Sequence, residues 1–169
     1  MSETIKVLGI ESAPYVDKLH VLDCIANARG RMTRKEVESA ERKLAKMIRT
    51  GAARKVTVIT THHFADGMYG REIFIPAGTF ATGGIHKTEH LNVLSSGELY
   101  VLTEDGLKHL KAPATFVSRA GMKRIGLTIT DVVWTTFHPN PANETDFFTM
   151  EAALYEGMDK QRTLTPVIP

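Results

Sequence analysis

The chain has 169 residues, of which 43% are hydrophobic and 24% are charged, and its formal net charge is +2. This composition is that of a folded globular protein with its own core, and it excludes a disordered or membrane-embedded chain. The single cysteine, Cys24, excludes an internal disulfide, and the first residues lack the basic-then-apolar order of a secretory signal. We therefore expect a cytoplasmic protein with no membrane partner.

Helices are predicted in the first third of the chain. Thr33 and Glu36 have the spacing of a capping box, apolar residues follow at helical spacing, and Gly51 comes after them. These signals predict an amphipathic helix over 33–50, and a second helix is predicted over 15–30. A sheet of the same chain or a partner subunit must cover the apolar stripe of the 33–50 helix, which consists of Val37, Ala40, Leu44, Met47 and Ile48.

The charge of this region has two interpretations. Residues 18–55 carry eleven Lys and Arg against four Asp and Glu, a local net charge of +7. Such a segment could bind nucleic acid, but a solvated helix face is the commoner explanation. No aromatic residue is interleaved with the basic residues, so bases have no stacking platform there. We therefore do not expect nucleic acid as the partner.

From Val56 onward the pattern changes to short β-type runs separated by Gly, Pro, Asp and Ser. Short strands with tight turns and no helices between them indicate an antiparallel sandwich or barrel, closed as a jelly-roll. A connection rich in Pro and Asn then leads to a predicted short helix at 146–156. The eight predicted strands are VTVIT (56–60), REIFIP (71–76), FATGGIH (80–86), LNVLS (91–95), ELYVLTE (98–104), TFVSR (115–119), RIGLTI (124–129) and DVVWTTFH (131–138).

Two stretches of this β-region resemble the two motifs of the cupin superfamily, whose barrels have six to eight strands. PAGTFATGGIHKTEHLNVLSSGE (76–98) resembles the first motif, with Gly97 at the hairpin between two strands. In the family pattern two histidines and a glutamate precede that glycine. Counted from Gly97, the first-histidine position holds Gly84, the second holds His86, and the glutamate position holds His90.

APATFVSRAGMKRIG (112–126) resembles the second motif, with Gly121 as the turn glycine and Arg119 in place of the usual proline. Arg124 stands where the last metal histidine of the family would be. The resemblance covers about 70–138 and implies a mainly β, cupin-like jelly-roll barrel (double-stranded β-helix). We assign this barrel to 56–140, an N-terminal helical segment to 1–55, and a C-terminal extension to 141–169.

Three segments also resemble the sequences of cupin-like proteins encoded by bacteriophages and prophages: HHFADGMYGREIFIPAGT, IHKTEHLNVL and DVVWTTFHP. This resemblance implies a source, with the host cytoplasm as the location, and no particular activity. Because cupin-like barrels frequently pair, we expect a homodimer.

A metal site is the first functional hypothesis, because neutral imidazoles bind first-row metals and three protein ligands leave an open position. His86 and His90 are the first candidates. In a straight strand, positions four apart lie about 13 Å from one another, so the polar KTE segment between them must bend. The third ligand would be Glu89, or His138 if the Trp134 face of the last strand looks into the barrel. The ion would be one divalent zinc, nickel, manganese or iron, and the alternative is that these are structural histidines.

A ligand site is the second hypothesis. Arg124, at a position that faces the cavity in the family, needs an anionic or carbonyl partner, and that partner could be a ligand. Tyr69 and Arg71 share one strand face, so Arg71 could add a second cation to the cavity. The alternative for Arg71 is a structural pair with a glutamate, either Glu72, Glu89 or Glu98. Trp134 would stack on a sugar or base ring, or belong to the core.

The leading functional hypothesis is a cupin-like domain that binds a small polar or anionic ligand, sugar- or nucleotide-like, beside a divalent metal. One alternative is a non-catalytic phage or prophage protein that sequesters a host metabolite or signal nucleotide, or binds a host protein. Another is a metal-dependent isomerase or oxygenase. The sequence assigns no catalytic residue, because it contains no nucleophile motif, phosphate loop or dinucleotide fingerprint.

Overall fold

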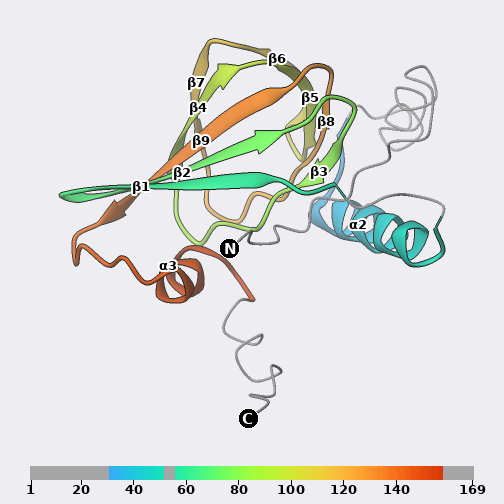
Figure 1. Ribbon diagram of the computed structural model, residues 1–169. Coiled ribbons are helices and arrows are strands. Elements are labelled where there is room, and N and C mark those ends of the chain that lie inside the picture. Colours follow the sequence, from blue (N-terminus) through green and yellow to red (C-terminus); the bar gives the residue numbers. More distant parts are fainter. Residues whose placement is uncertain (1–30, 52–55, 158–169) are drawn as a thin grey trace.

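The computed structural model describes residues 31–51 and 56–157, and within them two antiparallel sheets face each other (Figure 1). The helix predicted at 15–30 lies outside the described residues. The first sheet has the order β1 (Ile59–Ala65), β2 (Gly67–Ile75), β9 (Val132–Asn140), β4 (His90–Ser96) and β7 (Ala114–Ser118). The second has the order β3 (Phe80–Thr82), β8 (Ile125–Thr128), β5 (Glu98–Thr103) and β6 (Gly106–Lys111).

The chain passes between the two sheets several times, as in a jelly-roll, and every strand pair is antiparallel. The predicted mainly β barrel is therefore confirmed. One crossing, from β4 to β5, depends on Gly97, whose φ is +92°. A Cβ at this position would lie 2.1 Å from the carbonyl oxygen of Asp131, so only glycine fits.

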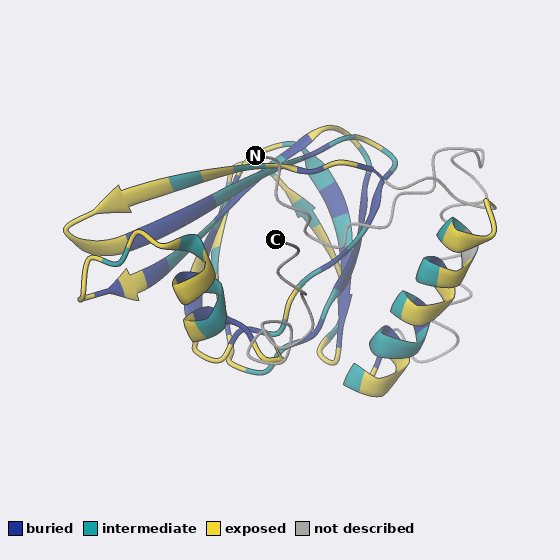
Figure 2. Cartoon of the chain, turned by 60° about the horizontal axis from the view of Figure 1, so that its bottom comes forward, coloured by how far each residue is buried: buried dark blue, intermediate teal, exposed yellow. Residues whose placement is uncertain are grey.

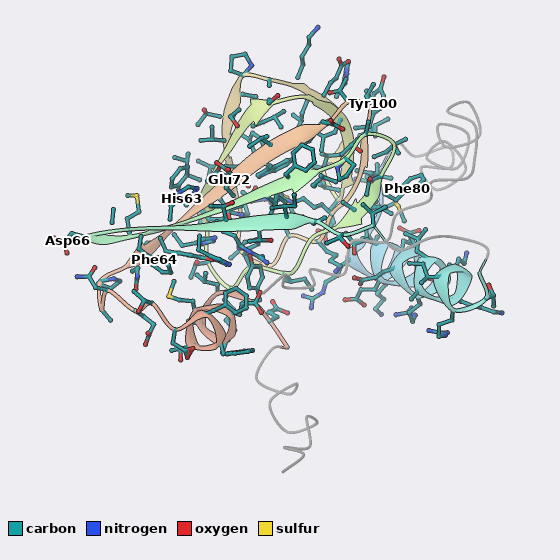
Figure 3. All side chains as sticks on the ribbon, viewed as in Figure 1. His63, Phe64, Asp66, Glu72, Phe80 and Tyr100 are labelled. Atoms are coloured by element: carbon teal, nitrogen blue, oxygen red, sulfur yellow. The ribbon has the colours of Figure 1, made fainter. Side chains whose placement is uncertain are left out.

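Two details of the strand prediction are corrected, because the described residues contain nine strands and the first is displaced. The missed strand is β6, an edge strand whose residues are mostly exposed, so no apolar alternation marks it. The first strand is Ile59–Ala65 and not 56–60, since main-chain pairing with β2 extends it through polar residues. In Figure 3, His63, Phe64 and Asp66 lie along the projecting part of this β1–β2 hairpin.

Helix α2 (Arg34–Arg49) has the predicted capping box of Thr33 and Glu36. Three residues of its apolar stripe, Val37, Ala40 and Leu44, are buried in one cluster with Phe80, Leu102, Ile125 and Leu127 of the four-stranded sheet. Glu41 accepts a hydrogen bond from Thr82 and pairs with Lys123 at 3.1 Å. The helix therefore packs on the outer face of its own barrel, beside which it lies in Figure 2. The predicted homodimer and the exact boundaries of the three segments remain predictions.

Helix α3 (Phe147–Leu154) falls within the predicted helix at 146–156, and the Asp146 side chain caps it by accepting from the backbone N–H of Thr149. Its buried residues Met150 and Leu154 form a cluster with Tyr69 and Tyr155. The chain then runs beside the segment that precedes β4: Glu156 N–H donates to Ile85, and Lys87 N–H donates to Leu154. Residues 154–156 are thus fastened to the barrel next to His86.

Between the sheets lies an apolar core that includes Ile75, Leu99, Val101, Val132 and Trp134. Because side chains alternate along a strand, the burial of Val132 and Trp134 fixes which face of β9 looks inward, and His138 shares that face. Among the described residues, no helix is long and apolar enough to span a membrane.

Candidate metal centre and cavity

A cavity of about 110 Å³ lies between the two sheets, and its wall changes from polar to apolar along the strands. Three strands pair side by side, so that Arg71, Thr136 and Asn92 form one row across β2, β9 and β4. The next inward-facing row on the same strands is Ile73, Trp134 and Leu94. A ligand in this cavity therefore meets charged and polar groups at one level and hydrocarbon at the next.

Three histidines come together beside this cavity. One ring nitrogen from each of His86, His90 and His138 lies within 4.8 Å of the other two, and all three residues are buried. The ring centroids of His86 and His90 are 3.8 Å apart, and each lies 5.0 Å from that of His138. Such a cluster of nitrogen donors on three separate segments matches the ligand set of a first-row metal.

The ring nitrogens of this trio have few other partners. Among the described residues, nothing bonds to Nδ1 of His86, Nε2 of His90 or either nitrogen of His138, although all are buried. Buried polar atoms are normally hydrogen-bonded, so four orphaned nitrogens in one place call for a ligand. His90 Nδ1 lies 3.2 Å from the Thr88 carbonyl oxygen, to which only an N–H can donate. That bond fixes the tautomer and leaves the lone pair on Nε2, which is the arrangement of a metal-binding histidine.

The electrostatics of the trio keep its rings neutral. Burial lowers the pKa of His86 to about 2, with further lowering by the adjacent His90 and His138. Burial likewise lowers the pKa of His138 to about 4, and His90 is shifted in the same direction. Because a metal binds only deprotonated imidazole, these shifts favour binding at neutral pH.

A bend between His86 and His90 makes their approach possible. His86 forms an isolated bridge with Tyr155, residues 87 and 88 bend, and His90 opens β4. The His86 carbonyl also accepts from Gly121 N–H of the second motif. The bend expected from the polar KTE segment is therefore present, and the two rings stack instead of lying about 13 Å apart.

The other described histidines and the acidic candidate lie elsewhere. Glu89 is exposed and is not part of the trio. His62 bonds through Nδ1 to the Tyr69 hydroxyl at 2.7 Å, and exposed His63 lies 3.6 Å from Glu72. His109 is on β6, where it lies 2.6 Å from Glu98.

Arg124 reaches the cavity wall without a carboxylate partner among the described residues. Its guanidinium donates to Ser118 Oγ at 2.6 Å, touches Met122 Sδ at 3.8 Å, and lies 5.6 Å from the ring centre of Trp134. Burial lowers its pKa to about 10. An arginine held in this way retains most of its fork of donors for another acceptor.

Arg71 also lines the cavity, but its charge is met by the protein. It donates to the Tyr155 hydroxyl at 2.7 Å and pairs with Glu151 at 3.5 Å. Burial lowers the pKa of Arg71, but Tyr155 and Glu151 raise it, and the result lies above the ordinary value. A structural Arg–Glu pair was expected as one alternative, and it forms with Glu151 of α3 instead of Glu72, Glu89 or Glu98.

Of the two aromatic candidates, Trp134 lines the cavity and Tyr69 lies behind the trio. The Trp134 indole donates to Asn92 Oδ1 at 3.0 Å, and Asn92 donates to the same Ser118 hydroxyl that binds Arg124. Tyr69 is buried, with its ring 6.3 Å from that of His138. Trp134 therefore belongs to the core and also forms part of the cavity wall, and its indole N–H already has a hydrogen-bond partner.

Tyr155 is a site residue that the sequence did not reveal. A Cβ on Gly84 would lie 2.6 Å from the Tyr155 ring, so the ring fills the space beside the first-histidine position of the motif. Its hydroxyl is held by Arg71, and its ring centre is 4.5 Å from that of His86. The one available signal was Gly84 itself, because a glycine there leaves room for a side chain from elsewhere.

No family model matches the chain, and no curated protein matches it. Several of the solved structures that match are described as cupin proteins, the superfamily whose motifs the sequence resembles. A cupin domain from Bordetella pertussis is 17% identical over 49% of this chain and 93% of its own, with a TM-score of 0.40. A cupin-2 domain protein from Shewanella frigidimarina is 12% identical over 47% and 80%, with a TM-score of 0.39.

A putative ethanolamine utilization protein Q from Salmonella typhimurium is 17% identical over 48% of this chain and 68% of its own, with a TM-score of 0.42. At these identities and TM-scores, the three structures show a partial likeness of the barrel and carry no information on ligand or activity.

Proposed function

We propose that the barrel binds a small polar or anionic ligand beside a divalent metal ion held by His86, His90 and His138. The observation that supports this proposal is the convergence of three buried, neutral imidazoles, each of which has at least one ring nitrogen without a partner among the described residues. Leaving such nitrogens unsatisfied is costly, and one ion would satisfy all three rings at once. The ligand part of the proposal rests on the adjoining cavity and its two arginines.

The donor set favours zinc, nickel, manganese or iron(II) over calcium or magnesium, because nitrogen donors suit the former and oxygen donors the latter. A metal with three protein ligands keeps positions open for a substrate or water, and it would supply Lewis acidity there. This open coordination also favours a metal-dependent isomerase or oxygenase as a second candidate. The binding function requires only that the ligand reach the cavity.

The test is the metal content of protein purified without chelator, measured by elemental analysis. We expect about one equivalent per chain in the wild type, and less than a tenth of that in H86A, H90A and H138A. His109→Ala is the matched control, because His109 is an exposed histidine outside the trio, and it should retain full metal. Circular dichroism verifies that each variant is folded. A wild type that neither carries metal nor gains thermal stability from added zinc, nickel, manganese or iron(II) would overturn the metal site.

A further inference from the structure

We propose that the ligand is a small monocarboxylic acid with a hydrocarbon body, whose carboxylate pairs with Arg124 while its body lies against Ile73, Ile75, Leu99 and Val101. The inference rests on the proposed ligand-binding function and names the class of compound that the cavity accepts. Three observations support it: Arg124 has no described counter-charge, the cavity is small, and much of the cavity wall offers no hydrogen bonds.

The first step concerns charge. Arg124 is the cavity arginine that no described carboxylate neutralises, whereas Arg71 already has Glu151 and Tyr155. A desolvated cation without a counter-charge is costly, so an anion that enters the cavity gains most at Arg124. The planar guanidinium fork matches the two oxygens of a carboxylate.

The second step concerns the body of the ligand. The apolar lining comprises Ile73, Ile75, Ala81, Leu99, Val101 and Trp134. The polar atoms nearest to this lining are already engaged: Asn92 accepts from the Trp134 indole and donates to Ser118. Hydroxyl groups of a sugar would lose water without finding partners, so a hydrocarbon body is favoured over a sugar or nucleotide.

The third step concerns size. The cavity of about 110 Å³ is of the same order as the roughly 150 Å³ apolar cavity that accepts benzene, a six-carbon compound. A body of a few carbon atoms fills this space, whereas most of a nucleotide would project out of it. Isovalerate, a branched five-carbon acid, is therefore a suitable probe.

The experiment is calorimetric titration of metal-loaded and chelator-treated protein with three matched compounds. Isovalerate has a carboxylate on a hydrocarbon body, isovaleramide has the same body without the charge, and glycerate has the carboxylate on a polar body. We expect isovalerate to bind at least tenfold more tightly than either of the others. Arg124→Met should weaken isovalerate at least tenfold, and Arg124→Lys should weaken it less. Arg119→Met, which removes an exposed arginine paired with Asp105, should leave the affinity unchanged.

Equal binding of isovaleramide, tighter binding of glycerate, or full isovalerate affinity in Arg124→Met would overturn the inference. Failure of all three compounds to bind protein that carries its metal would also overturn it, while the metal centre would stand. Isovalerate binding to chelator-treated protein that depends on Arg124 would support the inference, and the metal centre would still be judged by the metal content of the wild type. Metal content and circular dichroism of each variant show that a lost affinity is not a lost fold.

Discussion

Arg71, which is buried, and Arg124, which is half-buried, line one cavity, and they differ in the charge of their partners. Arg71 is joined by Tyr155 and Glu151, so its charge ties the C-terminal helix α3 to the barrel. Arg124 has a serine hydroxyl, a thioether and an indole face, none of which carries a negative charge. A residue that costs stability in this way and yet faces a cavity indicates a functional use.

The largest expected effect follows from removing Arg71, the arginine that has a carboxylate partner. Arg71→Met leaves Glu151 and the Tyr155 hydroxyl without their cation, and it should lower the free energy of unfolding by about 3 kcal/mol. Urea denaturation measures this change. Arg119→Met, at an exposed ion pair, is the control and should change stability by less than about 0.5 kcal/mol. A loss below about 1 kcal/mol for Arg71→Met would mean that the pair does not hold α3.

A second prediction concerns the partner of Arg71. Gly84→Ala places a Cβ within 2.6 Å of the Tyr155 ring, which must move away from Arg71. Overpacking of this kind should lower the free energy of unfolding by about 2 kcal/mol. In a double-mutant cycle with Tyr155→Leu, the two losses should be clearly less than additive, because the second change removes the clash. Simple additivity would show that the ring does not fill the space beside Gly84.

A third prediction uses pH on metal-free protein. The folded state holds His138 with a pKa of about 4, whereas an unfolded histidine titrates near 6.5. Below about pH 6.5 the unfolded chain therefore binds a proton that the folded chain does not, and stability falls until the folded pKa is reached. Between pH 7 and 5.5, the protonation of His138 in the unfolded chain alone should lower the free energy of unfolding by about 1 kcal/mol. Urea denaturation of His138→Gln across this range, with chelator present, should show a correspondingly shallower slope; an unchanged slope would contradict the assignment.

The smallest effect is expected at the unsatisfied arginine. Arg124→Met removes a desolvated cation with no described counter-charge, so stability should stay within about 1 kcal/mol of the wild type or rise. The same urea experiment as for Arg71→Met makes the comparison direct. A loss of more than about 2 kcal/mol would show that Arg124 has a structural partner, and the contrast between the two arginines would fail.

Much of the fold could be predicted because its signals are local. The capping box and apolar stripe of α2 appear in consecutive residues, and most strands appear as short β-type runs between Gly, Pro, Asp and Ser. The edge strand β6 gave no such signal, since its side chains face solvent and its place depends on pairing with β5. The same holds for β1, which main-chain bonds to β2 define.

Only part of the site could be predicted from the sequence. The spacing of His86 and His90 required a bend, and the polar residues between them indicated one. The inward face of β9 could not be chosen, because both faces are apolar; the register with β2 and β4 decides it in favour of His138. The contacts that Glu151 and Tyr155 make with Arg71 depend on where α3 packs against the barrel, and no local sequence pattern predicts that position.

The central claim is that three histidines bind one metal ion, and X-ray absorption of the zinc-loaded protein tests it most directly. We expect a first coordination shell that contains three imidazole nitrogens at about 2.0–2.1 Å, with the remaining position filled by an exogenous oxygen. His90→Ala should lose one nitrogen from this shell or lose the metal. A shell of oxygen alone, or a spectrum that is unchanged in the His90 variant, would contradict the account.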